Sequence, residues 1–160
     1  MGRRPVKTSE DFRGLSGQLN EVQLADAALS DEVLKRLSTA RYAWLTTVDR
    51  SGIPMPTLVW FRFDGRILTV YSHPRSTRIT HVFEHPEVSL HLESDGVGSR
   101  LLIIGGTAAV TAEGVDPRDD HEFWAKYHVE AEVTGLADAI ADYSSRITIT
   151  PTVLRTTFAT

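Results

Sequence analysis

The sequence predicts a mainly β protein with peripheral helices (α+β), built around a six-stranded antiparallel barrel that is closed or nearly closed. Short apolar and β-branched segments alternate with tight-turn signals, of which Asp64-Gly65 is the strongest two-residue hairpin signal. The 160 residues, 41% of them hydrophobic, are enough for one domain with a real core. Side chains fill the interior of a small barrel, so we expect a ligand on its outer surface or between two copies.

Strands are expected where apolar and β-branched residues dominate between turns. The expected ranges are 42–48, 57–63, 66–72, 88–93, 100–112 and 147–158. Gly105-Gly106 predicts a bulge or sharp bend in the fifth strand. Pro151 predicts that the last strand is an edge or carries a bulge, because proline cannot donate a ladder hydrogen bond.

Helices are expected at four places with caps or apolar stripes. They are 31–38 after Ser30, 76–84 after Ser76, 117–127 with Pro117 in its first turn, and 136–143. His85-Pro86 ends the second helix, since a residue before proline avoids helical angles. Residues 1–28 are expected to form a loosely ordered arm with a short helix near 21–28, and residues 29–160 the barrel domain.

Composition excludes several classes of protein. The 17 basic and 21 acidic residues give a net charge of −4, which argues against a nucleic-acid partner. The chain has no cysteine, so disulfides, thiolate metal sites and cysteine nucleophiles are excluded. No run approaches the roughly 18 apolar residues of a membrane span, and no signal peptide is evident. We therefore expect a cytoplasmic protein.

The standard catalytic and metal motifs are missing. We find no dinucleotide fingerprint, phosphate loop, nucleophile elbow or zinc-protease motif. His81 and His85 have a spacing that can bind a metal on one helix face, but no third ligand is evident. We therefore predict no metal site and no catalytic side chain.

The segment after the third strand favours an anion site. Ser76 is a good N-cap, and the arginines Arg75 and Arg78 flank it. A helix N-terminus offers free N–H groups and partial positive charge, to which Ser72 and Thr77 add hydroxyls. The alternative is an ordinary capped helix with solvated arginines.

Trp60 is a second candidate. Pro54 and Pro56 prevent the start of its strand from pairing fully on one edge. Unpaired backbone groups beside an indole can contact a flat heteroaromatic ring. The alternative is that Trp60 simply covers the barrel.

The order and spacing of several motifs resemble one known family. They are the segments 43–49, 52–56 and 59–61, the 64–65 hairpin, the arginine and serine turn, 85–90 and the 149–152 ending. Together they resemble the pyridoxamine 5′-phosphate oxidase-like superfamily of split β-barrels with an FMN-binding-like fold. Within it the chain looks most like the actinobacterial branch that uses the deazaflavin coenzyme F420.

The resemblance implies a homodimer with two cofactor sites at its interface. The implied phosphate ligands are Ser72, Arg75, Ser76, Thr77 and Arg78, and the strand expected against the ring system is Thr57, Leu58, Val59 and Trp60. The partner chain is expected to contribute Ser99 and Arg100, and Gly105-Gly106 to line the interface. Many relatives carry lysine where Arg78 stands, which keeps the charge but changes the geometry.

The resemblance also implies a function. The expected protein is an F420-dependent oxidoreductase that transfers a hydride between the cofactor and a small organic substrate. One alternative is an FMN-dependent oxidoreductase of the same fold. A second is a non-catalytic F420-binding or haem-binding protein, for which His73, His81 or His91 would be the axial ligand.

Overall fold

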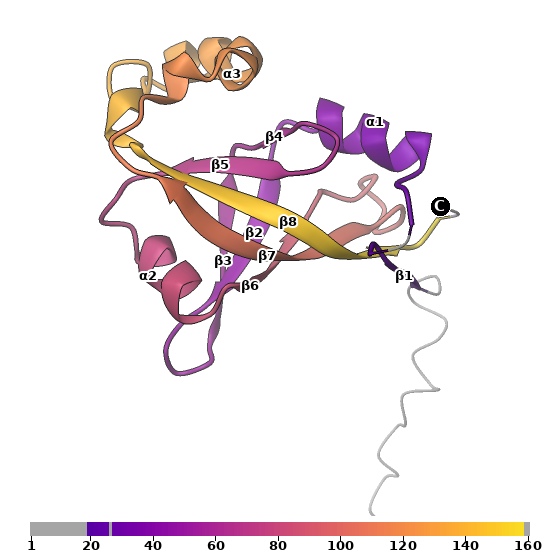
Figure 1. The fold of residues 1–160 in the computed structure, drawn as a ribbon. Helices are drawn as coiled ribbons and strands as arrows, with labels where there is room; N and C mark the ends of the chain where they lie inside the picture. The colour runs from indigo at the N-terminus through magenta and orange to yellow at the C-terminus, as the bar shows by residue number, and fades with distance from the viewer. Residues whose placement is uncertain (1–18, 26, 159–160) are drawn as a thin grey trace, which may run out of the picture.

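The computed structural model describes residues 19–25 and 27–158. The strands within these residues form one antiparallel sheet (Figure 1). They are β1 (Asn20–Gln23), β2 (Ala43–Val48), β3 (Pro54–Val59), β4 (Arg62–Phe63), β5 (Leu68–Ser72), β6 (Glu87–His91), β7 (Leu102–Ala112) and β8 (Ser145–Thr156). The helices are α1 (Asp31–Thr39), α2 (Thr77–Glu84) and α3 (His121–Val133), with 3₁₀ turns at Pro117–Asp119 and Ile140–Asp142.

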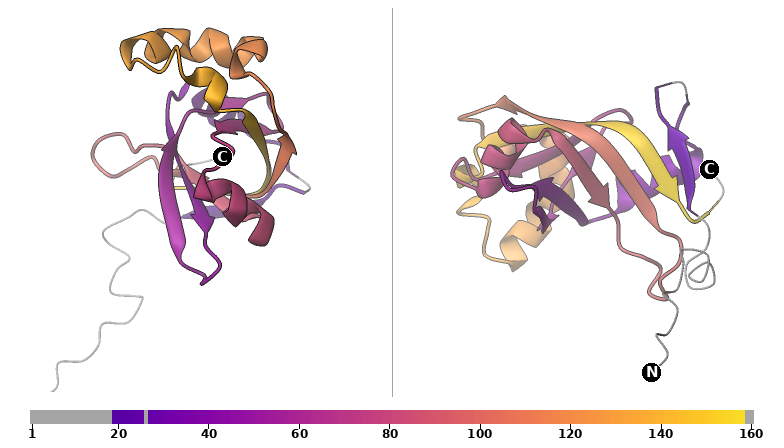
Figure 2. Two further views of the ribbon diagram at one scale, coloured as in Figure 1. Left: turned by 90° about the vertical axis from the view of Figure 1, so that its left-hand side faces the viewer. Right: turned by 90° about the horizontal axis from the view of Figure 1, so that it is seen from below.

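The sheet curls into a split barrel. Its strand order is β3-β2-β6-β7-β8-β5-β4, and β1 pairs with β8 outside this path. The terminal strands β3 and β4 are joined by only Trp60 and Phe61, so the chain itself holds the two sheet edges together (Figure 2). The predicted fold class is confirmed, but the sheet has eight strands rather than six. Two extra strands arise because the expected strand 57–63 breaks into β3 and β4, and because residues 20–23 add β1.

Side chains of helix α3 hydrogen-bond to the backbone of the link between β3 and β4. Phe61 has no strand partner, but its N–H donates to the hydroxyl of Tyr127 at 2.9 Å. The same hydroxyl lies 2.8 Å from the Phe61 carbonyl and 2.6 Å from the Arg41 carbonyl. Lys126 Nζ donates to the Phe61 carbonyl at 2.9 Å. The backbone of the link is thus satisfied by side chains, as a buried peptide group requires.

Apolar side chains fill the barrel, and helices close its ends. The larger fully buried residues are Leu45, Phe61, Leu68, Leu90, Leu102, Ile104, Ile147 and Ile149. Val33 and Leu37 of α1 join this core completely buried, and Ile79 and Val82 of α2 join it as well. Ser30 caps α1 by accepting from the Val33 N–H, as its sequence position predicts.

The bulge predicted at Pro151 is confirmed, and it lies in β8 opposite Gly105-Gly106, not in the strand of the two glycines. Gly105 pairs with Val153, but Gly106 pairs with Pro151, so β8 carries one extra residue. A Cβ on Gly106 would lie 2.6 Å from the Thr150 carbonyl oxygen. Only glycine therefore fits at this bulge.

Two predicted helices are wrong. Residues 20–23 form β1, because β8 runs beyond the end of β5 and leaves an open edge at residues 153–156 that β1 pairs with. The expected helix 136–143 is reduced to the 3₁₀ turn Ile140–Asp142, after Gly135 with φ 73° has ended α3. Residues 1–18 of the predicted arm lie outside the described residues, and its boundary with the barrel stays a prediction. No helix in the described ranges is long and apolar enough to span a membrane.

Replacing Tyr127 with Phe should lower the free energy of unfolding by about 1–3 kcal/mol, because the buried N–H of Phe61 would lose its acceptor. Urea denaturation near neutral pH measures the change. Tyr42→Phe, at a position that is 39% exposed, is the matched control and should cost less than about 0.5 kcal/mol. Equal stabilities of the two variants would contradict the role given to Tyr127.

Candidate functional site

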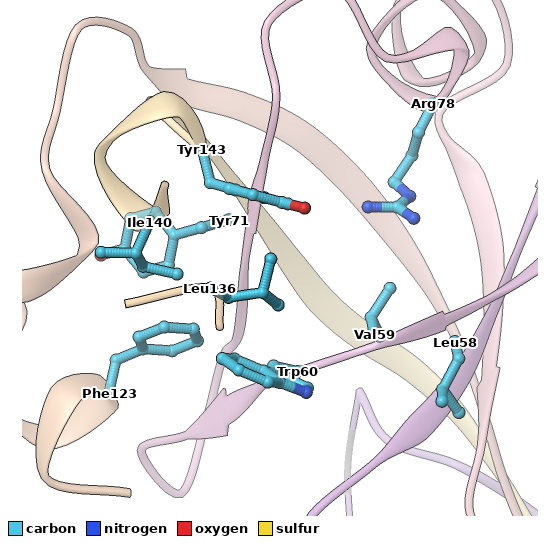
Figure 3. Close-up of a pocket in the computed structure, with 9 residues that line it drawn as sticks. All are labelled: Leu58, Val59, Trp60, Tyr71, Arg78, Phe123, Leu136, Ile140 and Tyr143. Atoms are coloured by element: carbon cyan, nitrogen blue, oxygen red, sulfur yellow. The ribbon is translucent and has the colours of Figure 1, made fainter. Parts of the chain in front are cut away.

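A cavity of about 240 Å³ lies beside the split of the barrel, where α2, α3 and the 134–143 segment meet strands β3 and β5. Its lining is mainly apolar and aromatic (Figure 3). The lining residues are Leu58, Val59, Trp60, Tyr71, Arg78, Phe123, Leu136, Ile140 and Tyr143. Of these residues, only Arg78 carries a formal charge.

Arg78 points into the cavity from the first turn of α2 (Figure 3). This helix begins at Thr77 because Ser76 caps it, its hydroxyl accepting from the Arg78 N–H. The guanidinium donates to the hydroxyl of Thr57 at 2.8 Å and to that of Ser72 at 3.4 Å. Thr57 lies on β3 and Ser72 on β5, so Arg78 bridges two strands on either side of the split.

The charge of Arg78 is not neutralised by any described residue. Within residues 19–25 and 27–158, no carboxylate lies within ion-pair distance of Arg78, and its buried Nε has no hydrogen-bond partner. Burial lowers the pKa of Arg78, although the nearby Tyr143 acts in the opposite direction. A desolvated cation without an anion is costly, so this end of the cavity suits an anionic ligand.

Stacked rings form the wall opposite Arg78. The Trp60 ring lies parallel to that of Tyr127, with centroids 4.9 Å apart and planes 3° apart. Phe123 packs against Tyr127 at 4.9 Å and against Tyr71 edge-on at 4.8 Å. The continuous packing of these four rings fixes the position of Trp60.

A charged network lies behind this wall. Asp120 caps α3 by accepting from the Phe123 N–H, and it also accepts from Arg62 and from the Tyr71 hydroxyl, each at 2.9 Å. Partial burial alone would raise the pKa of Asp120, but these hydrogen bonds outweigh it and lower the pKa. Burial and the bond to Asp120 raise the pKa of Tyr71 to about 12. This carboxylate is fully paired, in contrast to Arg78.

Comparison with known proteins identifies the family. The family model described as pyridoxamine 5′-phosphate oxidase matches residues 29–158. The chain belongs to this family. The superfamily expected from the sequence motifs is thereby confirmed. No curated protein matches the chain significantly.

Solved structures share the fold of this pyridoxamine 5′-phosphate oxidase family member. A protein named F420 reductase is 18% identical, with TM-score 0.60, covering 79% of this chain and 98% of its own. General Stress Protein 26 from Bacillus anthracis is 19% identical, with TM-score 0.61 and coverage of 79% and 92%. The haem storage protein HutZ from Vibrio cholerae is 14% identical, with TM-score 0.56 and coverage of 81% and 96%. At these identities the likeness establishes the fold alone.

The family fold brings together one part of the predicted cofactor set. Leu58, Val59, Trp60 and Arg78 line the cavity, and Thr57 and Ser72 hold the Arg78 guanidinium. The remaining members lie elsewhere. Arg75 and Thr77 are exposed and Ser76 is occupied as a cap, and none of these three lines the cavity.

Ser99 and Arg100 lie in the exposed loop between β6 and β7, beside α1. Arg100 pairs with Glu32 and stacks over Phe158, with its guanidinium carbon 5.1 Å from the ring centroid. Within one chain this loop does not reach the cavity lining. A role for both residues in a partner's site stays a prediction.

Sequence reasoning missed the far wall of the cavity. The sequence predicts helices over 117–127 and 136–143, but an apolar stripe does not tell a cavity wall from a core contact. The wall residues in these two ranges are Phe123, Leu136, Ile140 and Tyr143. Among the histidines, buried His81 bonds the Thr47 hydroxyl at 2.9 Å, and His85 ends α2. The residues that the structure describes contain no cluster of three metal-binding side chains.

An oxyanion should bind at Arg78 and stabilise the fold. At a phosphate concentration about five times its Kd, linkage predicts a gain of about 1 kcal/mol. Thermal denaturation with phosphate, against chloride at equal ionic strength, measures it. The gain should disappear in Arg78→Met and persist in Arg66→Met, which lies in the exposed hairpin. A full phosphate effect in Arg78→Met would contradict the anion site.

The Asp120 network should contribute stability that acid removes. The pKa of Asp120 is lower in the folded state than the unfolded value of about 3.9, so its contribution is full above that value and is lost as the pH falls through the folded pKa. Asp120→Asn should therefore cost about 1.5–3 kcal/mol at neutral pH, the worth of a charged hydrogen bond. The difference from wild type should shrink between about pH 5 and pH 2 in urea denaturation. A difference independent of pH would contradict this assignment.

Proposed function

We propose that this chain is an F420-dependent oxidoreductase that transfers a hydride between the deazaflavin and a small organic substrate, with FMN as the alternative cofactor. The observation that carries the proposal is the half-buried Arg78 guanidinium, which no described carboxylate neutralises, in the same cavity as Trp60. Both cofactors join a phosphate to a flat ring system. The guanidinium suits the phosphate, and the β3 segment that leads to Trp60 suits the flat ring system.

Different residues of this chain would bind the phosphate and the ring system of the cofactor. Arg78, held by Thr57 and Ser72, would bind the phosphate, and the β3 segment Thr57–Trp60 would lie along the ring system. When bound, the cofactor supplies two-electron hydride chemistry. The protein would then supply position and exclusion of water, so no catalytic acid or base is assigned.

We further propose a cytoplasmic homodimer with the cofactor at its interface. Ile53, Met55 and Leu58 on the β3 side and Phe83 of α2 are large apolar residues between 43% and 67% exposed. A second copy covering this surface would remove it from water and bring a further wall to the site. Ser99 and Arg100 of that copy, and Gly105-Gly106, are the contacts that the family resemblance suggests.

Haem is less well supported than a flavin-like cofactor. The candidate axial ligands His73, His81 and His91 do not line the cavity. His73 accepts from the Arg75 N–H, and His81 is engaged by Thr47. We therefore keep F420 and FMN as the two cofactors to be tested.

Side-by-side fluorescence titrations with F420 and FMN test the proposal. Arg78→Ala should weaken binding by about 1.5–3 kcal/mol, or about 10- to 150-fold, because a charged hydrogen bond to the phosphate is lost. Arg66→Ala is the matched control and should bind like wild type. An Arg75→Ala titration asks whether this exposed residue also contributes. Unchanged affinity in folded Arg78→Ala, or no binding of either cofactor to wild type, would overturn the assignment.

A further inference from the structure

The cavity has two chemically different ends. Arg78 occupies one end, and the other is a chamber lined by Trp60, Phe123, Leu136, Ile140 and Tyr143, which we call the aromatic chamber (Figure 3). Each side chain of this chamber is uncharged. The nearest charged network, around Asp120, lies behind Tyr71 and Phe123 and is internally paired. A second anion or a cation would find no opposite charge in the walls that this chain supplies.

The aromatic chamber carries two polar side-chain groups, the Trp60 indole N–H and the Tyr143 hydroxyl, and we consider Tyr143 because of its direction. Its hydroxyl points into the cavity, toward the side of Arg78 (Figure 3). Its backbone is fixed by a hydrogen bond from its N–H to the Ile140 carbonyl at 3.0 Å. Among the residues with described positions, no partner engages this hydroxyl. Buried or half-buried tyrosine hydroxyls normally find a partner, so a ligand oxygen fits here.

The volume limits what can occupy the aromatic chamber. The whole cavity measures about 240 Å³. Pockets that enclose drug-sized ligands are usually about 300–1,000 Å³, so this one holds a single compact molecule. It has no room for a coenzyme ring system together with a substrate. The coenzyme rings would therefore lie along the exposed β3 side, where Leu58 is 50% exposed.

We propose that the aromatic chamber is the substrate subsite, and that the substrate is an uncharged, flat molecule of about two rings with a carbonyl-type oxygen that accepts a hydrogen bond from Tyr143. This inference rests on the proposed function, because the cofactor phosphate takes Arg78. It excludes a phosphorylated substrate such as pyridoxamine 5′-phosphate, for which the family is named. Such a substrate would require a second cation, and Arg78 is the one charged residue among the described residues of this chain that line the cavity.

A matched set of three naphthalenes tests the chemistry of the chamber. The ketone 2-acetylnaphthalene carries the oxygen, 2-ethylnaphthalene lacks it, and 2-naphthoate carries a charge. Calorimetric titrations use wild type with saturating phosphate and Arg78→Met, so that Arg78 cannot bind the naphthoate directly. In both proteins the ketone should bind at least tenfold more tightly than the naphthoate. Equal or tighter binding of the naphthoate, or no binding of the ketone, would overturn the proposal.

Two variants locate the site. Tyr143→Phe should weaken ketone binding about three- to tenfold, the worth of one hydrogen bond, and leave 2-ethylnaphthalene unchanged. Val133→Ala, on the outer face of α3 and 82% exposed, is the control and should bind both like wild type. An equal loss of affinity for the ketone and for 2-ethylnaphthalene in Tyr143→Phe would indicate a packing defect. That result would contradict the hydrogen bond from Tyr143 to the ketone oxygen. Leu136→Trp, which fills the chamber, should abolish binding of both, and retained binding would place the ligand elsewhere.

The two proposals fail in different ways. Cofactor titrations of Tyr143→Phe should match wild type, whereas Arg78→Met should lose cofactor affinity and keep the ketone. If neither F420 nor FMN binds, the proposed function is overturned. The ketone titration needs no cofactor, so it still measures whether the chamber binds an uncharged carbonyl compound. If the ketone displaces a bound cofactor, the chamber holds the cofactor rings, and the substrate assignment is overturned.

Discussion

The hydroxyl of Tyr127 is the contact on which both the fold and the site depend. It satisfies the backbone of Phe61, the link where the sheet passes from its first edge to its last. The ring of the same tyrosine stacks under Trp60 and against Phe123. Barrel closure and the cavity wall are therefore set by one side chain of α3, and a change that loosens one must loosen the other.

The two charged groups nearest the cavity illustrate how structural and binding charges differ. Asp120 receives three hydrogen bonds, from Arg62, from Tyr71 and from a helix N–H, which together outweigh its burial. Arg78 is half-buried as well but, among the residues that the structure describes, donates only to the neutral hydroxyls of Thr57 and Ser72. Neutral hydroxyls orient a guanidinium without cancelling its charge, so the field of Arg78 remains available to a ligand.

Local signals in the sequence predicted local structure well. The caps Ser30 and Ser76 depend only on neighbouring residues, and the bulge beside Pro151 depends on a steric need that Gly106 reveals. A hairpin does follow β4, but residues 64–67 separate its paired strands instead of Asp64-Gly65 alone. Contacts between distant residues were not predictable in this way. Tyr127 lies 66 residues from Phe61 in the sequence. Strand β1 forms because β8 extends past the end of β5 and leaves residues 153–156 free to pair with it. The division of the arginine turn into inward Arg78 and exposed Arg75 likewise depends on the direction of α2, which periodicity alone does not give.

The choice of arginine at position 78 follows from the same geometry. Thr57 lies on the terminal strand β3, and Ser72 lies on β5, which neighbours the other terminal strand, β4. A planar guanidinium has five donors and spans both hydroxyls while keeping further N–H groups for an anion, whereas a compact ammonium has three donors at one point. Arg78 thus connects β3 with β5 through hydrogen bonds, and Tyr127 binds the backbone of the link between β3 and β4. An anion bound to Arg78 would consequently tighten the two sheet edges that also frame the cavity, so ligand binding and barrel closure reinforce each other.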